Sequence, residues 1–306
     1  MGEILLKGVK KFMYILSLCD GIGGGRIALH RAGIKVDKYF ASEIDKNAIK
    51  CADDNWNDII HIGDIKDVYY KDGILYTAEG NYELPYVDLL MSGTPCQTFS
   101  LANTSNNVGL AGTSGLFLEA LRILNETNPK WFFFENVRMT KKNKQLLDNY
   151  LGVTGVEINS NLVSFQNRPR IYWTNIPYEM PSDKHISFQD YRETKNLAKY
   201  KLPLKPSYIR MWNNGNGRNN IAFSCSNVTF ATKINTVSTK QKRCPNAGLV
   251  AYDDFCRTLT QSELEAAQTL PHGYTRNFSY NQAQKLIGNG WTIDVVAHIF
   301  SYLKND

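Results

Sequence analysis

Short apolar runs alternate with stretches of helical period over the first half of the chain. The apolar runs are bounded by glycine and small polar residues, which is typical of buried strands that end in turns. The predicted strands span residues 13–18, 36–42, 59–62, 87–92 and 131–134, and the predicted helices span residues 26–33, 45–55 and 115–125. This alternation favours an α/β fold with a doubly wound, mostly parallel sheet.

The pattern changes near residue 177. From there to about residue 256 the chain is rich in Asn, Ser, Lys and Tyr and shows little period, and the stretch WNNGNGRNN is typical of an exposed loop. A helical pattern returns over residues 262–270 and 292–303. The middle of the chain is therefore expected to differ in structure from the parts that flank it.

Composition bounds the class of protein. The chain has 306 residues, of which 43% are hydrophobic, 12% aromatic and 21% charged, so it is neither a disordered chain, a collagen-like repeat nor a disulfide mini-scaffold. Its apolar runs are too short to span a bilayer. No cleavage site follows the apolar stretch near the N-terminus, so we expect a reducing cellular interior and no membrane partner.

The net charge of +6 is unevenly distributed. Residues 178–256 hold 12 lysines and arginines against 6 acidic residues, which leaves the rest of the chain neutral. A local basic excess favours a polyanionic partner such as nucleic acid. The alternative is a solvated, lysine-rich surface.

Six cysteines are present, none of them in a CxxC pattern or at zinc spacing from histidines. We therefore expect no metal site and no disulfide framework. One cysteine remains a candidate nucleophile, and Cys96 is the best placed. It follows a predicted strand on the turn Gly93-Thr94-Pro95, where a thiolate would face a cleft. The alternative for Cys96 is a small buried side chain.

Two further groups lie where predicted strands end or run extended. Glu135 follows an aromatic run and could donate a proton at the same edge of the sheet. Arg168 and Arg170 are two positions apart in an extended segment, so they share a face that suits a planar carbonyl or a phosphate. A capping or surface role is the alternative for each.

A cofactor site is indicated at the first strand-to-helix turn. Gly21, Gly23 and their neighbours would let a ligand approach the backbone and the helix N-terminus. Glu43 and Asp64 end the next two predicted strands, where carboxylates accept hydrogen bonds from a ribose or an adenine amino group. Together they favour a nucleoside-bearing cofactor over a turn that is glycine-rich only for packing.

The chain resembles the DNA cytosine-5 methyltransferase family over nearly its full length. Eight blocks occur in the family's order: DGIGGG (20–25), SEID (42–45), GDI (63–65), GTPCQTFS (93–100), FFENV (133–137), QNRPRIY (166–172), RTLTQSELEAAQTLP (257–271) and IGNGWTIDV (287–295). The compact length and the setting of Trp291 look most similar to the animal de novo branch, and bacterial and phage enzymes also fit.

The resemblance implies a role for each matching residue. Cys96 would attack C6 of a flipped-out cytosine, Glu135 would protonate N3, and Arg170, supported by Arg168, would contact O2. The expected cofactor is S-adenosyl-L-methionine, leaving as S-adenosyl-L-homocysteine. Its expected contacts are Asp20, Gly21, Ile22, Gly23, Glu43, Ile44, Asp64, Ile65, Pro95, Asn289 and Trp291. The expected contacts with DNA, double-stranded on this interpretation, are Gln97, Ser100, Thr236, Lys240, Lys242 and Arg243.

The same resemblance implies two domains. Residues 1–177 and 257–306 would form the catalytic and cofactor-binding domain, and residues 178–256 the target-recognition domain. Two positions depart from the family. Cys19 stands where the family usually has Phe against the adenine, and Ser114 stands where it often has Arg, so cofactor and DNA affinity are less certain than reaction type.

Several questions stay open at this point. The substrate could be transfer RNA, the chain could be a catalytically silent DNA-binding paralogue, or the transferred group could be larger than methyl. The sequence does not reveal the recognition sequence or whether the protein is a monomer or a homodimer. It also does not distinguish a role in restriction–modification from one in phage self-protection or regulation. The expected location is the cytoplasm of a bacterial or phage-infected cell or, for a eukaryotic chain, the nucleus.

Overall fold

The computed structural model describes residues 13–94, 115–213, 226–241 and 245–304. Its centre is a sheet of seven strands in the order β3-β2-β1-β7-β8-β10-β9. These are β1 (Met13–Leu18), β2 (Val36–Ser42), β3 (Ile59–His61), β7 (Leu89–Ser92), β8 (Trp131–Val137), β9 (Val156–Asn159) and β10 (Pro169–Thr174). All neighbours pair in parallel except β10, which runs antiparallel to both β8 and β9. The predicted α/β fold is confirmed.

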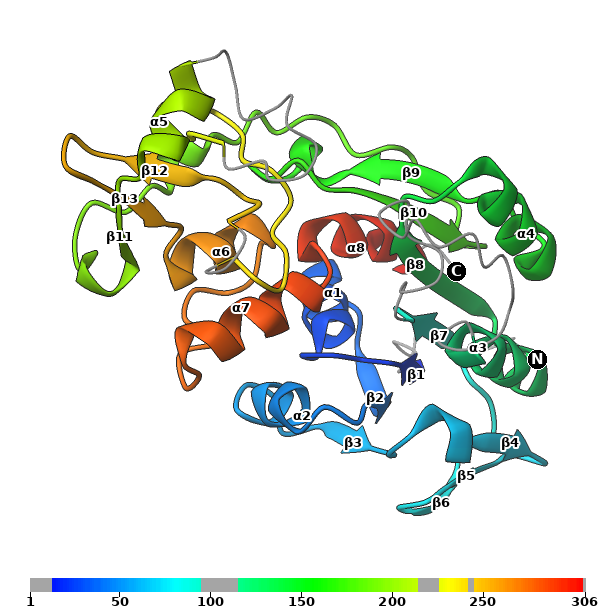
Figure 1. Cartoon of the computed structure of the whole chain (residues 1–306). Coiled ribbons are helices and arrows are strands. Elements are labelled where there is room, and N and C mark those ends of the chain that lie inside the picture. Colours follow the sequence, from blue (N-terminus) through cyan, green and yellow to red (C-terminus); the bar gives the residue numbers. More distant parts are fainter. Residues whose placement is uncertain (1–12, 95–114, 214–225, 242–244, 305–306) are drawn as a thin grey trace, which may run out of the picture.

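Helices cover both faces of this sheet (Figure 1). Alternate residues of β1 point to opposite faces, so Ile15 belongs to the cluster that contains α1 (Gly24–Ala32), α2 (Lys46–Asp53) and α8 (Ile293–Phe300). Leu16 belongs to the cluster that contains α3 (Gly115–Thr127) and α4 (Lys141–Leu151). The sheet is therefore doubly wound, as the sequence predicts.

The first helix lies unusually close to the sheet. A Cβ on Gly25 would lie 2.5 Å from Sδ of Met91 and 2.8 Å from the Tyr39 hydroxyl, so a larger residue at this point of α1 would displace these buried side chains. The helix ends at Gly33, whose φ of +70° suits a glycine cap. This close approach brings the N-terminus of α1 to the carboxyl end of β1, where the glycine turn lies.

Two small antiparallel sheets flank the main one. The first, β4 (Tyr69–Lys71), β5 (Ile74–Thr77) and β6 (Gly80–Glu83), packs near α3. The second has the order β11-β13-β12 and comprises β11 (Lys201–Pro203), β12 (Leu249–Ala251) and β13 (Phe255–Thr258). Figure 1 shows this second sheet beside α5 (Pro206–Asn213), on the opposite side of the molecule from β4–β6.

The middle of the chain contributes to two cores. Leu249 and Cys256 form a small cluster with residues of β11 and α5. Val228, Ile234 and Val237 instead belong to the main core, together with α6 (Gln261–Ala267) and α7 (Tyr280–Asn289). The division at residues 178–256 stays a prediction, and β13 continues across its C-terminal boundary.

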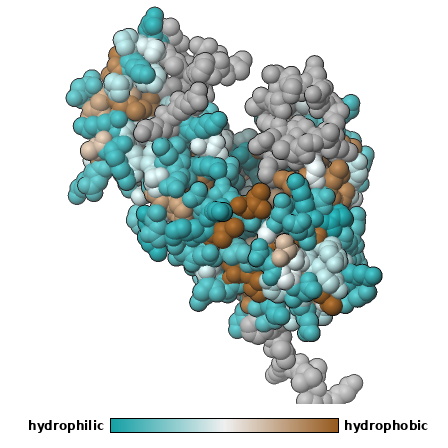
Figure 2. All heavy atoms as spheres, turned by 60° about the horizontal axis from the view of Figure 1, so that its bottom comes forward, coloured by the Kyte–Doolittle hydropathy of each residue, from teal (hydrophilic) through white to brown (hydrophobic). Residues whose placement is uncertain are grey.

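The surface is polar on the face seen in Figure 2, with hydrophobic residues in scattered patches. Among the described residues, no helix combines the length and hydrophobicity needed to cross a bilayer. Within the same residues, no group of three or more His, Cys, Asp or Glu side chains is arranged to hold a metal ion.

Candidate active site

A cavity of about 340 Å³ lies where β1, β2, β7 and β8 end. Its lining comes from Cys19, Gly21, Ile22, Glu43, Asp45, Ala48, Gly93, Thr94, Glu135, Asn136, Val137, Arg168, Arg170, Leu286, Gly288, Asn289 and Gly290. Ligands of open α/β sheets bind at the carboxyl ends of the strands, because the loops that follow parallel strands meet there. The cavity is therefore where the fold itself favours a site.

Glu43 organises one end of this cavity. One carboxylate oxygen accepts the N–H of Gly21 at 2.8 Å, and the other accepts the N–H groups of Ile44 and Asp45 at 2.8 Å. Gly21 has a φ of +66°, and a Cβ there would meet nothing within 4 Å, so the turn presents bare backbone to open space. Carboxylate oxygens have further lone pairs, which leaves Glu43 able to accept hydroxyl groups of a ribose.

The turn between β1 and α1 also holds two titratable side chains. Burial, together with the charges of Glu43, Asp64 and Asp20, raises the pKa of the Cys19 thiol to about 12. Burial also raises the pKa of Asp20, against the hydrogen bonds that the Ser17 and Tyr39 hydroxyls each donate to its Oδ1 at 2.5 Å. Cys19 is therefore a neutral wall of the cavity, and the Asp20 side chain supports the turn from behind.

Glu135 dominates the other end. Its Oε1 lies 3.0 Å from Nε of Arg170, and its Oε2 accepts a hydrogen bond from Nε1 of Trp291 at 3.1 Å. The Glu135 and Arg170 side chains are only 12% and 13% exposed. β8 and β10 pair antiparallel, with Glu135 opposite Tyr172 and Arg170 opposite Val137. Glu135 and Arg170 are therefore diagonal neighbours on adjacent strands.

The aromatic and amide neighbours of Glu135 fix the local geometry. The Trp291 ring packs on Gly93, where a Cβ would lie 2.8 Å from Nε1, and edge-on to Phe133 with ring centroids 5.2 Å apart. Asn136 donates from Nδ2 to the carbonyl of Thr94 at 3.3 Å. The end of β7 is therefore tied to β8 immediately before residues 95–100.

Arg168 occupies a different position from Arg170. It is 4% exposed, and its guanidinium donates to the carbonyls of Val237 at 2.9 Å, Gly288 at 3.1 Å and Gly290 at 3.0 Å. The two arginines therefore line one cavity but point their hydrogen bonds to different partners. Arg168 holds distant backbone carbonyls, whereas Arg170 faces the Glu135 carboxylate and donates to the carbonyl of its own neighbour Pro169 at 2.9 Å.

Residues 13–154 and 156–305 match the sequence pattern of the C-5 cytosine-specific DNA methylases. The chain belongs to this family. The match covers all the described elements that build the cavity, so the family assignment and the location of the site agree.

Similar curated proteins include methyltransferases of bacteria and phages. The chain is 30% identical over 213 residues to the orphan methyltransferase M.SPRI of Bacillus phage SPR, a match to 65% of this chain and 45% of that protein. It is 37% identical over 171 residues to the type II methyltransferase M1.ScrFI of Lactococcus lactis subsp. cremoris, covering 52% and 40%. It is 32% identical over 217 residues to M.HpaII of Haemophilus parainfluenzae, covering 63% and 56%. The chain thus spans about half the length of these relatives.

Solved structures support the fold. The S. pombe Dnmt2 methyltransferase matches 95% of this chain and 96% of its own, with a TM-score of 0.65 at 18% identity. The Entamoeba histolytica methyltransferase EhMeth matches 96% and 98%, with a TM-score of 0.72 at 16% identity. At these identities the likeness concerns the fold.

The predicted site residues of this family member fall into three groups. Those that line the cavity are Gly21, Ile22, Glu43, Glu135, Arg168, Arg170 and Asn289. Those described but outside its lining are Asp20, Gly23, Ile44, Asp64, Ile65, Trp291, Thr236 and Lys240. Those outside the described residues are Pro95, Cys96, Gln97, Ser100, Lys242 and Arg243, together with the variant position Ser114.

The second group has identifiable positions. Ile44 is 67% exposed next to Glu43, Asp64 accepts the N–H of Lys66 at 3.0 Å, and Ile65 is buried in the core. The Thr236 hydroxyl donates to the carbonyl of Asn167 at 2.7 Å, which uses its proton within the protein. Lys240 is exposed.

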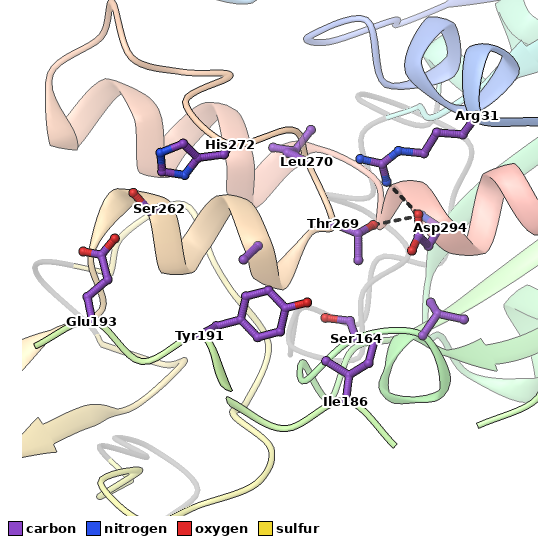
Figure 3. Close-up of a pocket in the computed structure, with 12 residues that line it drawn as sticks. Arg31, Ser164, Ile186, Tyr191, Glu193, Ser262, Thr269, Leu270, His272 and Asp294 are labelled. Atoms are coloured by element: carbon purple, nitrogen blue, oxygen red, sulfur yellow. Dashed lines mark hydrogen bonds and ion pairs between the residues drawn. The ribbon is translucent and has the colours of Figure 1, made fainter. Parts of the chain in front are cut away.

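Sequence reasoning missed several lining residues. Asn136, Thr94 and Gly288 line the cavity, and the only signal for them is their place inside the blocks FFENV, GTPCQTFS and IGNGWTIDV. A second cavity, of about 500 Å³, was also not predicted. Figure 3 shows Arg31 and Asp294, paired at 2.6 Å, at one end of it and Glu193 at the other.

Proposed function

We propose that this chain is a DNA cytosine-5 methyltransferase that acts on double-stranded DNA and uses S-adenosyl-L-methionine. One observation carries the proposal: the Glu135–Arg170 pair and the Glu43–Gly21 turn lie in the same cavity. The Glu135 carboxyl group, held by the Arg170 guanidinium, can hydrogen-bond the ring of a pyrimidine. The Glu43 carboxylate beside the Gly21 backbone can hydrogen-bond the hydroxyl groups of a nucleoside. A cavity that holds both ligands is suited to methyl transfer from a nucleoside-bearing cofactor to a pyrimidine.

The lining of the cavity also suits a sulfonium cofactor. This lining includes the acidic residues Glu43, Asp45 and Glu135 against the two arginines Arg168 and Arg170. Arg170 pairs with Glu135 at the far end, so the end around Glu43 keeps a negative charge that attracts a positively charged ligand. The exposed Ile44 adds apolar surface next to Glu43. When bound, S-adenosyl-L-methionine supplies an electrophilic methyl group and leaves as S-adenosyl-L-homocysteine.

Cys96 is the nucleophile in this proposal. Burial raises the pKa of the Cys51 thiol to about 12 and also raises the pKa of Cys256, so these two, like Cys19, are neutral at physiological pH. Cys96 follows Thr94, which lines the cavity, by two positions in the sequence. A thiolate there adds to C6 of cytosine while Glu135 gives a proton to N3, which makes C5 nucleophilic. Once C5 has taken the methyl group and lost its proton to a base, the sulfur leaves as a thiolate and N3 returns its proton to Glu135.

The cytosine must leave the duplex for this to happen. Base flipping costs a few kcal/mol. The 12 lysines and arginines of residues 178–256 are suited to phosphate contacts that offset this cost.

The test is a covalent trap. Duplex DNA with 5-fluorocytosine cannot lose a proton from C5, so the wild-type protein with S-adenosyl-L-methionine should form a denaturant-resistant complex. Cys96→Ser should form none, and Glu135→Gln should form it far more slowly while still binding DNA. Equal trapping by wild type and Cys96→Ser would refute the nucleophile.

Substrate assays separate the alternatives. Methylation of duplex DNA but not of transfer RNA supports the proposal, and activity on RNA alone refutes the substrate. Binding without any product would indicate a silent paralogue. Mass spectrometry of the product base reports whether the group added is methyl, and bisulfite sequencing of host DNA reports the recognition site.

A further inference from the structure

We propose that Arg168 is a positioning residue that couples DNA binding to cofactor binding, by tying residues 236–240 to residues 288–290. The first stretch, here the recognition segment, contains predicted DNA contacts. The second, here the cofactor loop, consists of the last two residues of α7 and Gly290, and it lines the cavity. The inference rests on the proposed function, because it assigns one ligand to each side of this junction.

The guanidinium of Arg168 bridges the two stretches directly. Nη1 donates to Val237 of the recognition segment at 2.9 Å, and Nη2 donates to Gly288 and Gly290 of the cofactor loop at 3.1 and 3.0 Å. A guanidinium is planar with a fixed fork of donors, so its partners cannot shift independently without losing a hydrogen bond. At 4% exposure, such a loss would leave a carbonyl without water to replace the donor.

Backbone packing removes the remaining freedom. A Cβ on Gly288 would lie 2.6 Å from the carbonyl carbon of Ser238 and 2.7 Å from the amide nitrogen of Thr239. These are backbone atoms, which cannot rotate away as the end of a side chain can. The recognition segment therefore rests directly on the last turn of α7, and movement of one is transmitted to the other.

A second, parallel connection runs through two buried glutamines. Gln166 accepts the N–H of Val237 at 2.7 Å and donates to Oε1 of Gln268 at 3.0 Å. Gln268 in turn donates to the carbonyls of Ile287 and Gly290 at 2.9 Å. Both polar groups of the Val237 backbone are therefore held by side chains that are linked to the cofactor loop, Arg168 directly and Gln166 through Gln268.

The proposal separates Arg168 from Arg170. Arg170 faces Glu135 and is placed to contact the substrate. The hydrogen bonds described for Arg168 instead go to backbone carbonyl groups. A positioning role predicts that changing Arg168 alters how the two ligands influence each other. A substrate contact predicts a change in turnover alone.

The experiment measures binding, without catalysis. Labelled duplex DNA is first selected from a random-sequence library by the wild-type protein, and its Kd is measured with and without saturating S-adenosyl-L-homocysteine. We expect the wild-type ratio of the two Kd values to be about five or more, the range typical of coupled sites. Arg168→Lys keeps the charge but lacks the fork, and should bring the ratio to about two or less.

Two glycine variants form a matched pair. Gly288→Ala forces the recognition segment away and should also lower the ratio. Gly290→Ala lies in the same loop, but its Cβ would meet its nearest neighbour at an ordinary 3.5 Å, so the ratio should stay at the wild-type value even if cofactor affinity changes. Because the ratio compares one protein with itself, a uniform loss of either affinity does not move it.

The outcomes are distinct. Wild-type protein that binds no DNA or no S-adenosyl-L-homocysteine would overturn the proposed function and this inference together. Normal binding with a wild-type ratio of one would overturn the coupling alone. So would an unchanged ratio in both Arg168→Lys and Gly288→Ala, with thermal unfolding near wild type. A lowered ratio in either folded variant, with Gly290→Ala unchanged, supports the proposal.

Discussion

The indole of Trp291 donates a hydrogen bond to Glu135 across a sequence separation of 156 residues. Arg170 faces the other oxygen of the same carboxylate, so both oxygens of the proposed acid are held by donors from elsewhere in the chain. The ring is itself wedged between Gly93 and Phe133. Trp291, which the resemblance placed with the cofactor, therefore orients the acid in this structure.

Replacing Trp291 tests this second role. Trp291→Phe keeps an aromatic ring beside Gly93 but removes the donor to Glu135. A hydrogen bond contributes about 0.5–1.5 kcal/mol net, so losing the one that orients Glu135 should lower kcat by about two- to tenfold. The Kd for S-adenosyl-L-homocysteine, measured by calorimetry, should change little. A large loss of cofactor affinity at normal kcat would show that the cofactor contact is the main role.

Gly93→Ala provides an independent check through the same contact. Its Cβ would lie 2.8 Å from Nε1 of Trp291, so the indole must move away from Glu135. We expect a loss of kcat similar to that of Trp291→Phe, and the double variant should be no worse than either single one, since both break one hydrogen bond. Additive losses would indicate that Gly93 acts by another route.

The first strands of the main sheet could be predicted because their signals are local. The apolar run before Gly21 became β1, and the run ending at Ser92 became β7, each within a few residues of prediction. β8 continues to Val137, beyond the predicted end at residue 134, so Glu135 lies within the strand rather than after it. Its pairing with β10 extends it, and that pairing is not visible in the local sequence.

The missed elements depend on distant partners. β11 pairs with β13, whose residues lie more than fifty positions away, and both are too short for a periodic signal. The backbone partners of Arg168 could not be predicted for the same reason, because Val237 and Gly290 lie 69 and 122 positions away. The residue types indicated the chemistry of the site, but only the tertiary structure shows that Arg170, and not Arg168, contacts Glu135.

A fully buried ion pair gives a stability prediction. Arg257 and Glu263 are paired at 2.8 Å with both side chains 0% exposed, and Glu263 also caps α6 and accepts the N–H of Glu193. Arg257→Met would leave the carboxylate buried and unpaired. We expect a loss of about 3–5 kcal/mol in the free energy of unfolding, measured with denaturant.

The control is an exposed pair of the same type. Arg138 and Glu157 make a bidentate contact at 2.6 and 2.8 Å, but the arginine side chain is 57% exposed. Arg138→Met should cost less than about 1 kcal/mol, because water replaces the lost partner. Equal effects of the two substitutions would contradict the importance of burial at Arg257.

The raised pKa of Cys19 predicts a distinctive reaction with iodoacetamide. The thiolate is the reactive form, and burial shifts the thiol pKa from 9.0 to about 12. The rate of Cys19 alkylation should therefore rise about tenfold per pH unit from about pH 7 to about pH 10 without levelling off. Peptide mass spectrometry would follow Cys19 separately from the other cysteines. Because Cys19 lines the cavity, S-adenosyl-L-homocysteine should slow the reaction, and a rate that levels off near pH 9 or ignores the ligand would contradict this placement.

Lys240 offers a test of the DNA-binding face. It is exposed within the recognition segment and was predicted to contact DNA. A phosphate contact releases a counterion, so Lys240→Met should reduce the slope of log Kd against log salt by about one and weaken binding similarly for all sequences. Lys71→Met is the matched control, since Lys71 is also exposed but lies on β4, across the molecule from α5 and its sheet (Figure 1). The slope should be unchanged in Lys71→Met. If both variants lowered it equally, the effect would come from net charge, and Lys240 would not be a phosphate contact.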